Sequence, residues 1–419
     1  MADSGSASPI RPPIPLGVWA LLFASFITTF GVVGQVTILG KQVFDMTGRE
    51  LDLGLLGLAE FLPTAILSPI TGSVADRYDR RIVYAGGLAG EFAASIGLFL
   101  YIRTDPTSVL PIFLLVILFG FARAFVAPSS RALPVDLAPE GSLERVVAMA
   151  AVAWQSGVIV GPVVFGFVFL AGVSIPYLVA ALCFATAGGL LLIVPASTVE
   201  KASAAGGFRE AVHTAFEGLR FIRGNQILFG AISLDLFAVL FGGAVALLPA
   251  IADERLGVGA LGLGWLRAST GIGAASVALV LTRWPIVRRV GRVLLVVVGL
   301  FGAATIVLGF TRSYVVAVLA LLVLSGADAV SVFIRATIVP LATPESMRGR
   351  VLAVEHVFIG ASNELGAFES GVAGQLVGLV GAVVLGGVGT LAVVALWWRY
   401  FPALRNIDRF DEIRPAQVT

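Results

Sequence analysis

Long apolar stretches recur along the whole chain and are separated by short polar loops. Each stretch has about the 20 residues that an α-helix needs to cross the apolar core of a bilayer. Membrane β-strands are shorter and alternate apolar with polar residues, which these stretches do not do. The pattern predicts about twelve membrane-spanning helices, with a glycine-rich turn near Val380 separating the last two: 14–39, 51–74, 82–102, 108–132, 144–170, 174–195, 226–251, 260–282, 292–311, 314–341, 351–377 and 379–401.

Composition supports a lipid environment. Of the 419 residues, 58% are hydrophobic and only 13% are charged, and the mean hydropathy is +0.97. A soluble domain has about a quarter of its residues charged, so much of this protein's surface must face lipid. The 49 glycines agree, because small residues let membrane helices approach closely. The net charge of +2 is too small to indicate a nucleic-acid partner.

The loop charges predict the orientation, because cytoplasmic loops keep the Lys and Arg residues. With the N-terminus inside, the cytoplasmic loops hold most of the basic residues, including Arg77, Arg80, Arg81, Arg288, Arg289 and Arg405. The opposite side holds Lys41, Arg49, Arg103, Arg255 and Arg312. We therefore expect both termini to be cytoplasmic.

The polar segments divide the chain into two halves. Residues 1–13 lack the basic region and cleavage site of a signal peptide and are expected to form a disordered tail. Bundles at 14–195 and 226–401 flank a cytoplasmic linker at 196–225, and 402–419 form a cytoplasmic tail. Phe208, Val212, Phe216 and Leu219 recur at helical spacing in the linker, which predicts an amphipathic helix. This helix is either a simple connection or a regulatory or partner site.

Internal similarity indicates a duplication. Pro139-Glu140, followed by Arg145-Val146 and Ala148, recurs as Pro344-Glu345, followed by Arg350-Val351 and Ala353, about 205 residues later. In the same register, Gly161 and Gly166 match Gly366 and Gly371, and Gly120 with Pro134 matches Gly326 with Pro340. Two repeated six-helix units around a central cavity are typical of secondary transporters that work by alternating access.

Three motifs resemble known transporters. The loop Gly72-Ser73-Val74-Ala75-Asp76-Arg77-Tyr78-Asp79-Arg80-Arg81 resembles the signature between helices 2 and 3 of the major facilitator superfamily. Trp154-Gln155-Ser156-Gly157, with Gly161, Pro162 and Gly166, is similar to the helix-5 motif of its antiporter branches. Pro128 to Pro134 and Arg348 to Val351 resemble the enterobactin-exporter and macrolide-efflux branch. The second-half copy of the loop keeps Arg288 and Arg289 but lacks the glycine and the aspartate.

The resemblance suggests roles for these motifs. A carboxylate at Asp76 can face a helix N-terminus or pair with arginines, so that Gly72, Asp76, Arg77, Arg80 and Arg81 form a cytoplasmic gate. The alternative is a basic loop that only sets the topology. Gly157, Gly161 and Gly166 provide a flat face for close helix packing, and Pro162 provides a kink. That face is either ordinary packing or a sealed interface that bends.

Ionisable residues at membrane depth are costly and usually functional. Near the middle of the predicted spans lie Glu60, Glu91, Arg123, Asp235, Asp328 and Glu364. Arg335 and Glu355 lie nearer the cytoplasmic side and Arg267 nearer the outside. The family resemblance places Arg123, Asp235 and Asp328 on cavity-lining helices, and Glu60 and Glu364 between the halves. Carboxylates there could take up and release protons and so couple transport to the proton gradient. Alternatively, Arg123 could neutralise Glu91 and fix a helix pair.

These features predict an all-α integral membrane protein with the fold of the major facilitator superfamily. We expect a monomeric, proton-coupled exporter of a drug, siderophore or similar metabolite in the bacterial inner membrane. Alternatives are an importer or lipid transporter on the same scaffold, or a non-transporting sensor. An enzyme is not expected, and neither is a cofactor: the sequence has no phosphate-binding loop, and His213, His356 and Cys183 are too few for a zinc site.

Overall fold

The computed structural model describes residues 13–196 and 208–415, and the regular elements within these ranges are helices. Residues 1–12 of the predicted tail at 1–13 and part of the predicted linker lie outside the described residues. The first half contains α1 (Leu16–Thr47), α2 (Glu50–Arg77), α3 (Arg80–Ile102), α4 (Leu110–Asp136), α5 (Leu143–Phe169) and α6 (Ile175–Leu190).

The second half is less regular. It contains α7 (Phe208–Gly224), α8 (Gln226–Phe241), η1 (Gly243–Leu247), α9 (Leu248–Ala250), η2 (Ile251–Leu256), α10 (Gly259–Arg283), α11 (Val290–Phe310), α12 (Tyr314–Ala342), α13 (Glu345–Tyr400), α14 (Pro402–Arg405) and η3 (Phe410–Glu412). From α8 to η2 the chain passes through 3₁₀, α and π geometry around Pro249, whose ring nitrogen cannot donate a hydrogen bond. Helix α13 is broken at Gly378, which has φ 76° and ψ 161°, two residues before Val380.

Local sequence signals explain where several helices begin and end. Gly48 ends α1 in the left-handed conformation, with φ 61°, and its N–H donates to the carbonyl of Phe44 at 2.7 Å. The Asp79 carboxylate accepts from the N–H of Arg81 at 2.9 Å and so caps α3. Asn225 caps α8 in the same way. Helix α7 therefore ends where α8 begins, with a single capping residue between them.

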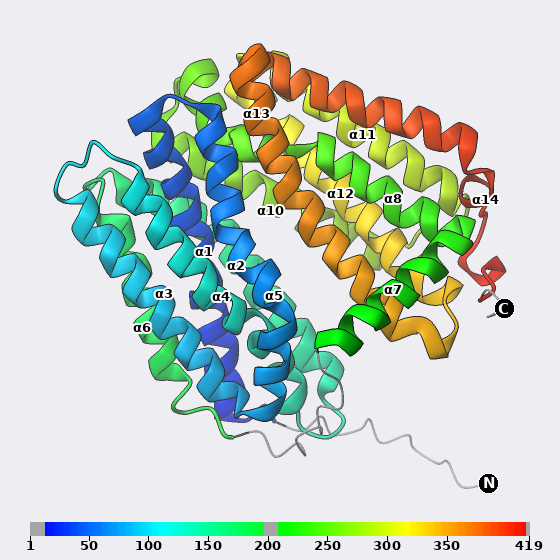
Figure 1. Ribbon diagram of the computed structural model, residues 1–419, viewed down its shortest axis with the longest axis horizontal. Coiled ribbons are helices and arrows are strands. Elements are labelled where there is room, and N and C mark those ends of the chain that lie inside the picture. Colours follow the sequence, from blue (N-terminus) through cyan, green and yellow to red (C-terminus); the bar gives the residue numbers. More distant parts are fainter. Residues whose placement is uncertain (1–12, 197–207, 416–419) are drawn as a thin grey trace, which may run out of the picture.

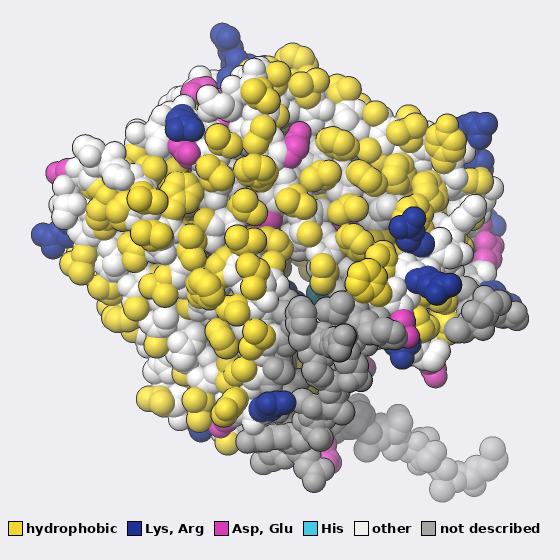
Figure 2. Space-filling model, in the orientation of Figure 1, with side chains coloured by type: hydrophobic (Ala, Val, Ile, Leu, Met, Phe, Trp, Pro, Cys, Tyr) yellow, Lys and Arg dark blue, Asp and Glu magenta, His cyan; other side chains and the backbone are white. Residues whose placement is uncertain are grey.

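Nine helical segments within the described ranges are long and apolar enough to cross a membrane. They include α1, the segment from α8 to η2, and all 56 residues of α13. The apolar helix α6 is shorter, with 16 residues, and α2 falls outside the nine. Figure 2 shows hydrophobic side chains covering most of one face, with charged side chains mainly toward its edges. The fold is that of a polytopic helical membrane protein.

The helices form two bundles with separate cores. One core contains Leu21, Leu88 and Phe165 from the first half, and another contains Leu228, Leu294 and Ile338 from the second. Figure 1 shows the bundles close together at the end where α13 is broken and diverging toward the end where α7 lies. We call these the closed end and the open end. At the closed end a third core joins Phe44 and Leu53 to apolar residues of the second half, such as Leu247 and Leu263.

Matching glycines make matching contacts in the two halves. A Cβ on Gly161 would lie 2.7 Å from the carbonyl oxygen of Phe30 in α1, and one on Gly366 would lie 2.7 Å from that of Val239 in α8. Both contacts are therefore within one half.

The second glycine of each pair faces the opposite half. A Cβ on Gly166 would lie 2.8 Å from the carbonyl oxygen of Ala260 in α10, and one on Gly371 would lie 2.9 Å from that of Glu50 in α2. The duplication seen in the sequence thus corresponds to equivalent positions in the two bundles, both within each half and across the interface.

Candidate functional site

A cavity of about 450 Å³ lies between the two halves. Its walls come from α1, α2 and α5 on one side and from the second half, mainly α8, α10, α12 and α13, on the other. Most lining residues are apolar, among them Val158, Val239 and Leu324. The charged lining residues are Glu60, Arg267, Asp328 and Glu364. An apolar cavity with a few convergent charged groups is the usual form of a small-molecule site.

Glu60, Arg267 and Glu364 form a charged cluster with Arg123, and these residues come from α2, α10, α13 and α4, respectively. Glu60 in α2 pairs with Arg123 in α4, at 3.6 Å between Oε1 and Nε. Arg267 in α10 lies within electrostatic range of both Glu60 and Glu364, and its buried Nε has no hydrogen-bond partner among the described residues. The sequence predicted that Arg267 would lie nearer the outside. Its place in the cavity was missed, although the signal was available, since an arginine inside a predicted span is rare.

Asp235 and Asp328, both predicted for the cavity, have different environments. Asp328 lines the central cavity, and it also lines a void of about 10 Å³ together with Asp235. Asp235 is 6% exposed and pairs with Arg335 of α12 at 2.6 Å. No partner for Asp235 in its own half was predicted from the sequence. Arg335 follows Asp328 by seven residues, a spacing that places the two on one helical face.

Glu91 is brought into a core instead of a cavity. It is 0% exposed, it does not line any of the cavities named here, and neither of its carboxylate oxygens has a hydrogen-bond partner among the described residues. Arg123 and Glu60 lie within electrostatic range of it. Arg123 forms its ion pair with Glu60 and not with Glu91. The proposed Arg123–Glu91 pairing is therefore not the one the structure contains.

A second cavity of about 450 Å³ opens within the first half. Arg123, Arg131 and several hydroxyl groups line it, including that of Thr28, which accepts a hydrogen bond from Tyr84 at 3.1 Å. Trp154 of the helix-5 motif lines this cavity and the central one. Because its lining residues all belong to the first half, this cavity marks a surface that the second half leaves uncovered at the open end.

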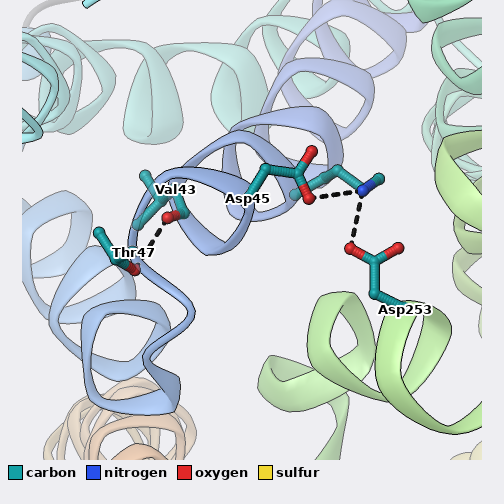
Figure 3. Close-up of polar contacts among 5 residues, drawn as sticks. Val43, Asp45, Thr47 and Asp253 are labelled. Carbon is teal, nitrogen blue, oxygen red and sulfur yellow. Dashed lines mark hydrogen bonds and ion pairs between the residues drawn. The ribbon is translucent and has the colours of Figure 1, made fainter. Parts of the chain in front are cut away.

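An ion-pair cluster closes the opposite end. The amine of Lys41 in α1 lies 2.6 Å from Asp45 Oδ1 and 2.7 Å from Asp253 Oδ2 in η2. Figure 3 shows Asp45 and Asp253 pointing from different helices toward this one nitrogen. Lys41 is 7% exposed. Lys41 was predicted only as a loop charge, although its spacing to Asp45 is that of a helical ion pair.

The loop signature lies at the open end. Asp76 falls on the last turn of α2, but its side chain lies outside the described residues. Arg80 pairs with Asp136 at the end of α4, at 2.6 Å, and Arg81 donates to the carbonyl of Val194 at 2.9 Å. Arg77 is exposed, and a Cβ on Gly72 would meet nothing within 4 Å. The described contacts of Arg80 and Arg81 tie α3 to other parts of the first half.

The helix-5 motif packs in two directions. Gly157 and Gly161 face α1, whereas Gly166 faces α10 of the other half. The carbonyl of Pro162 also faces α10, where it lies against Gly264. Gln155 donates to the carbonyl of Gly271 in α10 at 2.8 Å. One face of α5 thus packs within its bundle and another forms the interface between halves. No group of three or more His, Cys, Asp or Glu among the described residues is arranged to hold a metal ion.

Comparisons with known proteins identify the family. The family profile described as Major Facilitator Superfamily matches residues 19–354. The enterobactin exporter EntS of Escherichia coli O1:K1 / APEC is 26% identical over 96% of this chain and 94% of its own length. A Bacillus subtilis (strain 168) protein named as an uncharacterized MFS-type transporter, YfiS, is 25% identical over 70% of this chain and 68% of its own length.

Solved structures show the same fold at low sequence identity. The human organic anion transporter MFSD10 (TETRAN) has a TM-score of 0.66 at 19% identity and covers 92% of this chain and 100% of its own. A bacterial homologue of the human lysosomal transporter Spinster has a TM-score of 0.71 at 15% identity and covers 97% of this chain and 100% of its own. The resemblance inferred from the loop and helix-5 motifs is confirmed, and the chain belongs to the major facilitator superfamily of membrane transporters.

Proposed function

We propose that the protein is a proton-coupled exporter that moves a mid-sized, partly apolar molecule out of the cell by alternating access. The central cavity between the two halves supports this proposal best, because its apolar walls carry Glu60, Asp328 and Glu364 together with Arg267. Acidic groups beside a substrate can bind protons or release them, and groups that face the cavity can couple that exchange directly to substrate binding.

The topology that we propose has twelve spans. It counts α2 and α6 as spans and divides α13 at Gly378 into two. With both termini in the cytoplasm of a bacterial cell, the open end faces inward and the closed end faces outward. The protein then has the form of an inward-facing transporter, in which the cavity that contains Arg131 leads from the cytoplasm toward the central cavity.

The closed end supports alternating access. The Lys41–Asp253 ion pair and the close approaches of Gly166 to α10 and of Gly371 to α2 all join the halves there. Rocking the bundles outward requires breaking these contacts. Export as the direction is supported by the helix-5 motif and by EntS, which is described as an exporter of enterobactin.

Transport in proteoliposomes tests the proposal. The purified chain is reconstituted with an imposed pH gradient, and dyes, macrolides and catecholate siderophores are assayed for uptake. At least one compound should accumulate against its gradient, and collapsing the pH gradient should abolish this accumulation. Glu60→Gln should reduce the accumulation, whereas Glu140→Gln, outside both cavities, should not. Accumulation that persists after collapse of the pH gradient would contradict proton coupling.

A further inference from the structure

The carboxylates of the central cavity outnumber its basic groups. Glu60, Asp328 and Glu364 line it, and Arg267 is the basic residue among its described lining residues. Arg123 lines the adjoining cavity of the first half and compensates the charge of Glu60, with which it pairs at 3.6 Å. Arg267 lies within electrostatic range of Glu364. When all these groups are ionised, one negative charge is left without compensation.

We assign that charge to Asp328, because Arg123 and Arg267 lie within electrostatic range of Glu60 and Glu364. Among the residues that the structure describes, none forms an ion pair or a hydrogen bond with its carboxylate. The basic group within electrostatic range of Asp328 is Arg335, which already pairs with Asp235 at 2.6 Å and donates from its Nε to Ser331. Both members of that pair are almost fully buried, so Arg335 is held away from the cavity.

We infer that the central cavity binds a monovalent organic cation, whose charge takes the place of the proton on Asp328. An uncompensated carboxylate in an apolar cavity is unfavourable, so Asp328 needs either a proton or a cation beside it. The two cannot occupy it together without creating an excess positive charge. Mutually exclusive binding at one carboxylate gives exchange of one proton for one cation.

The surroundings of Asp328 favour a bulky cation over an inorganic one. Phe301 lines both the central cavity and the small void beside Asp328, and Trp154 lines the cavity from the opposite half. Aromatic rings attract organic cations through their π faces. The other walls are largely aliphatic, and the volume of about 450 Å³ is in the range of sites for small organic molecules.

This inference rests on the proposed transport function but is tested by binding alone, without a gradient. Tetraphenylphosphonium and tetraphenylborate have nearly the same size and shape and opposite charges. We expect the full chain in detergent to bind radiolabelled tetraphenylphosphonium saturably and to release protons into a weakly buffered medium as it binds. Tetraphenylborate should neither compete for the site nor release protons.

The variant Asp328→Asn should bind tetraphenylphosphonium roughly tenfold more weakly or worse, because a hydrogen bond or ion pair to a charged group is lost, and should release no protons. Asp328→Glu, which keeps the charge, should partly restore both properties, and Glu144→Gln at the start of α5 should behave as the wild type. Thermal unfolding checks that each variant is folded.

Equal binding of the two probes, or unchanged binding by a folded Asp328→Asn variant, would overturn the inference. Gradient-driven transport of a neutral or anionic compound, without tetraphenylphosphonium binding, would leave the transport function standing and refute the substrate class. Failure of all gradient-driven transport would instead count against the proposed function.

Discussion

The amine of Lys41 in the first half lies 2.7 Å from the carboxylate of Asp253 in the second half, and both residues are at the closed end. Asp45, at 2.6 Å, shares the same amine. The pair is only partly shielded from solvent, because the Asp253 side chain is 25% exposed. A partly exposed ion pair can therefore stabilise the closed end without fixing it permanently, as a reversible gate requires.

Removing the Lys41 charge should shift the protein toward the outward-open state. We expect Lys41→Met to lengthen the distance between spin labels placed at Thr107 and Ser313, two loop positions at this end, in a Cys183→Ser background. Double electron–electron resonance measures this distance. The exchanged pair Lys41→Asp with Asp253→Lys should restore the short distance, and Arg312→Gln should not change it. If Lys41→Met gives the wild-type distance distribution, the ion pair does not hold the closed end.

The close approach of α5 to α10 should make Gly166 intolerant of a side chain. Gly166→Val would place methyl groups against the backbone of Ala260, and overpacking of this kind costs about 1–3 kcal/mol. We expect a lower midpoint of thermal unfolding in detergent and reduced transport.

Gly188→Val is the matched control for that substitution. Gly188 lies in α6, and a Cβ there would meet nothing within 4 Å. The control should unfold close to the wild-type temperature. Similar effects of the two substitutions would show that the interface is not tightly packed at Gly166.

Asp235 should act as a structural residue. Breaking a buried ion pair leaves an uncompensated charge and typically costs about 3–5 kcal/mol. Asp235→Asn should therefore destabilise the protein strongly by leaving Arg335 unpaired, and Asp235→Leu combined with Arg335→Met should recover much of the loss. Thermal unfolding of the wild type and of both variants provides the measurement. A stable Asp235→Asn single variant would contradict this role and would return Asp235 to the candidates for proton transfer.

The sequence predicted the helical membrane fold and the duplication well, because both depend on patterns along the chain. Apolar length marked the helices, and the Gly161–Gly166 and Gly366–Gly371 pairs marked equivalent positions. The charge partners were harder to predict. Glu60, Asp328 and Glu364 face the cavity, but Glu91 faces a core and Asp235 faces Arg335. Depth in a span can be counted along the sequence, whereas the direction of a side chain depends on helix rotation and on packing against other helices.

The residue pairs formed across the interface between halves were also beyond sequence reasoning. Lys41 and Asp253 are 212 residues apart, and nothing local to either residue indicates the other. Arg267 could have been recognised as unusual from its place inside a span. Its position within electrostatic range of Glu60 and Glu364 follows only from the way α10 packs against α5 and faces α2 and α13 across the cavity.

Proton movement during substrate transport tests the central claim most directly. Proteoliposomes containing a pH-sensitive dye in the lumen, with no initial pH gradient, receive a transported compound on one side. We predict that entry of the compound drives protons out and raises the luminal pH, and that vesicles loaded with the same amount of folded Asp328→Asn protein show no such change. Transport of the compound by the wild type with an unchanged luminal pH would contradict the claim that this protein exchanges protons for its substrate.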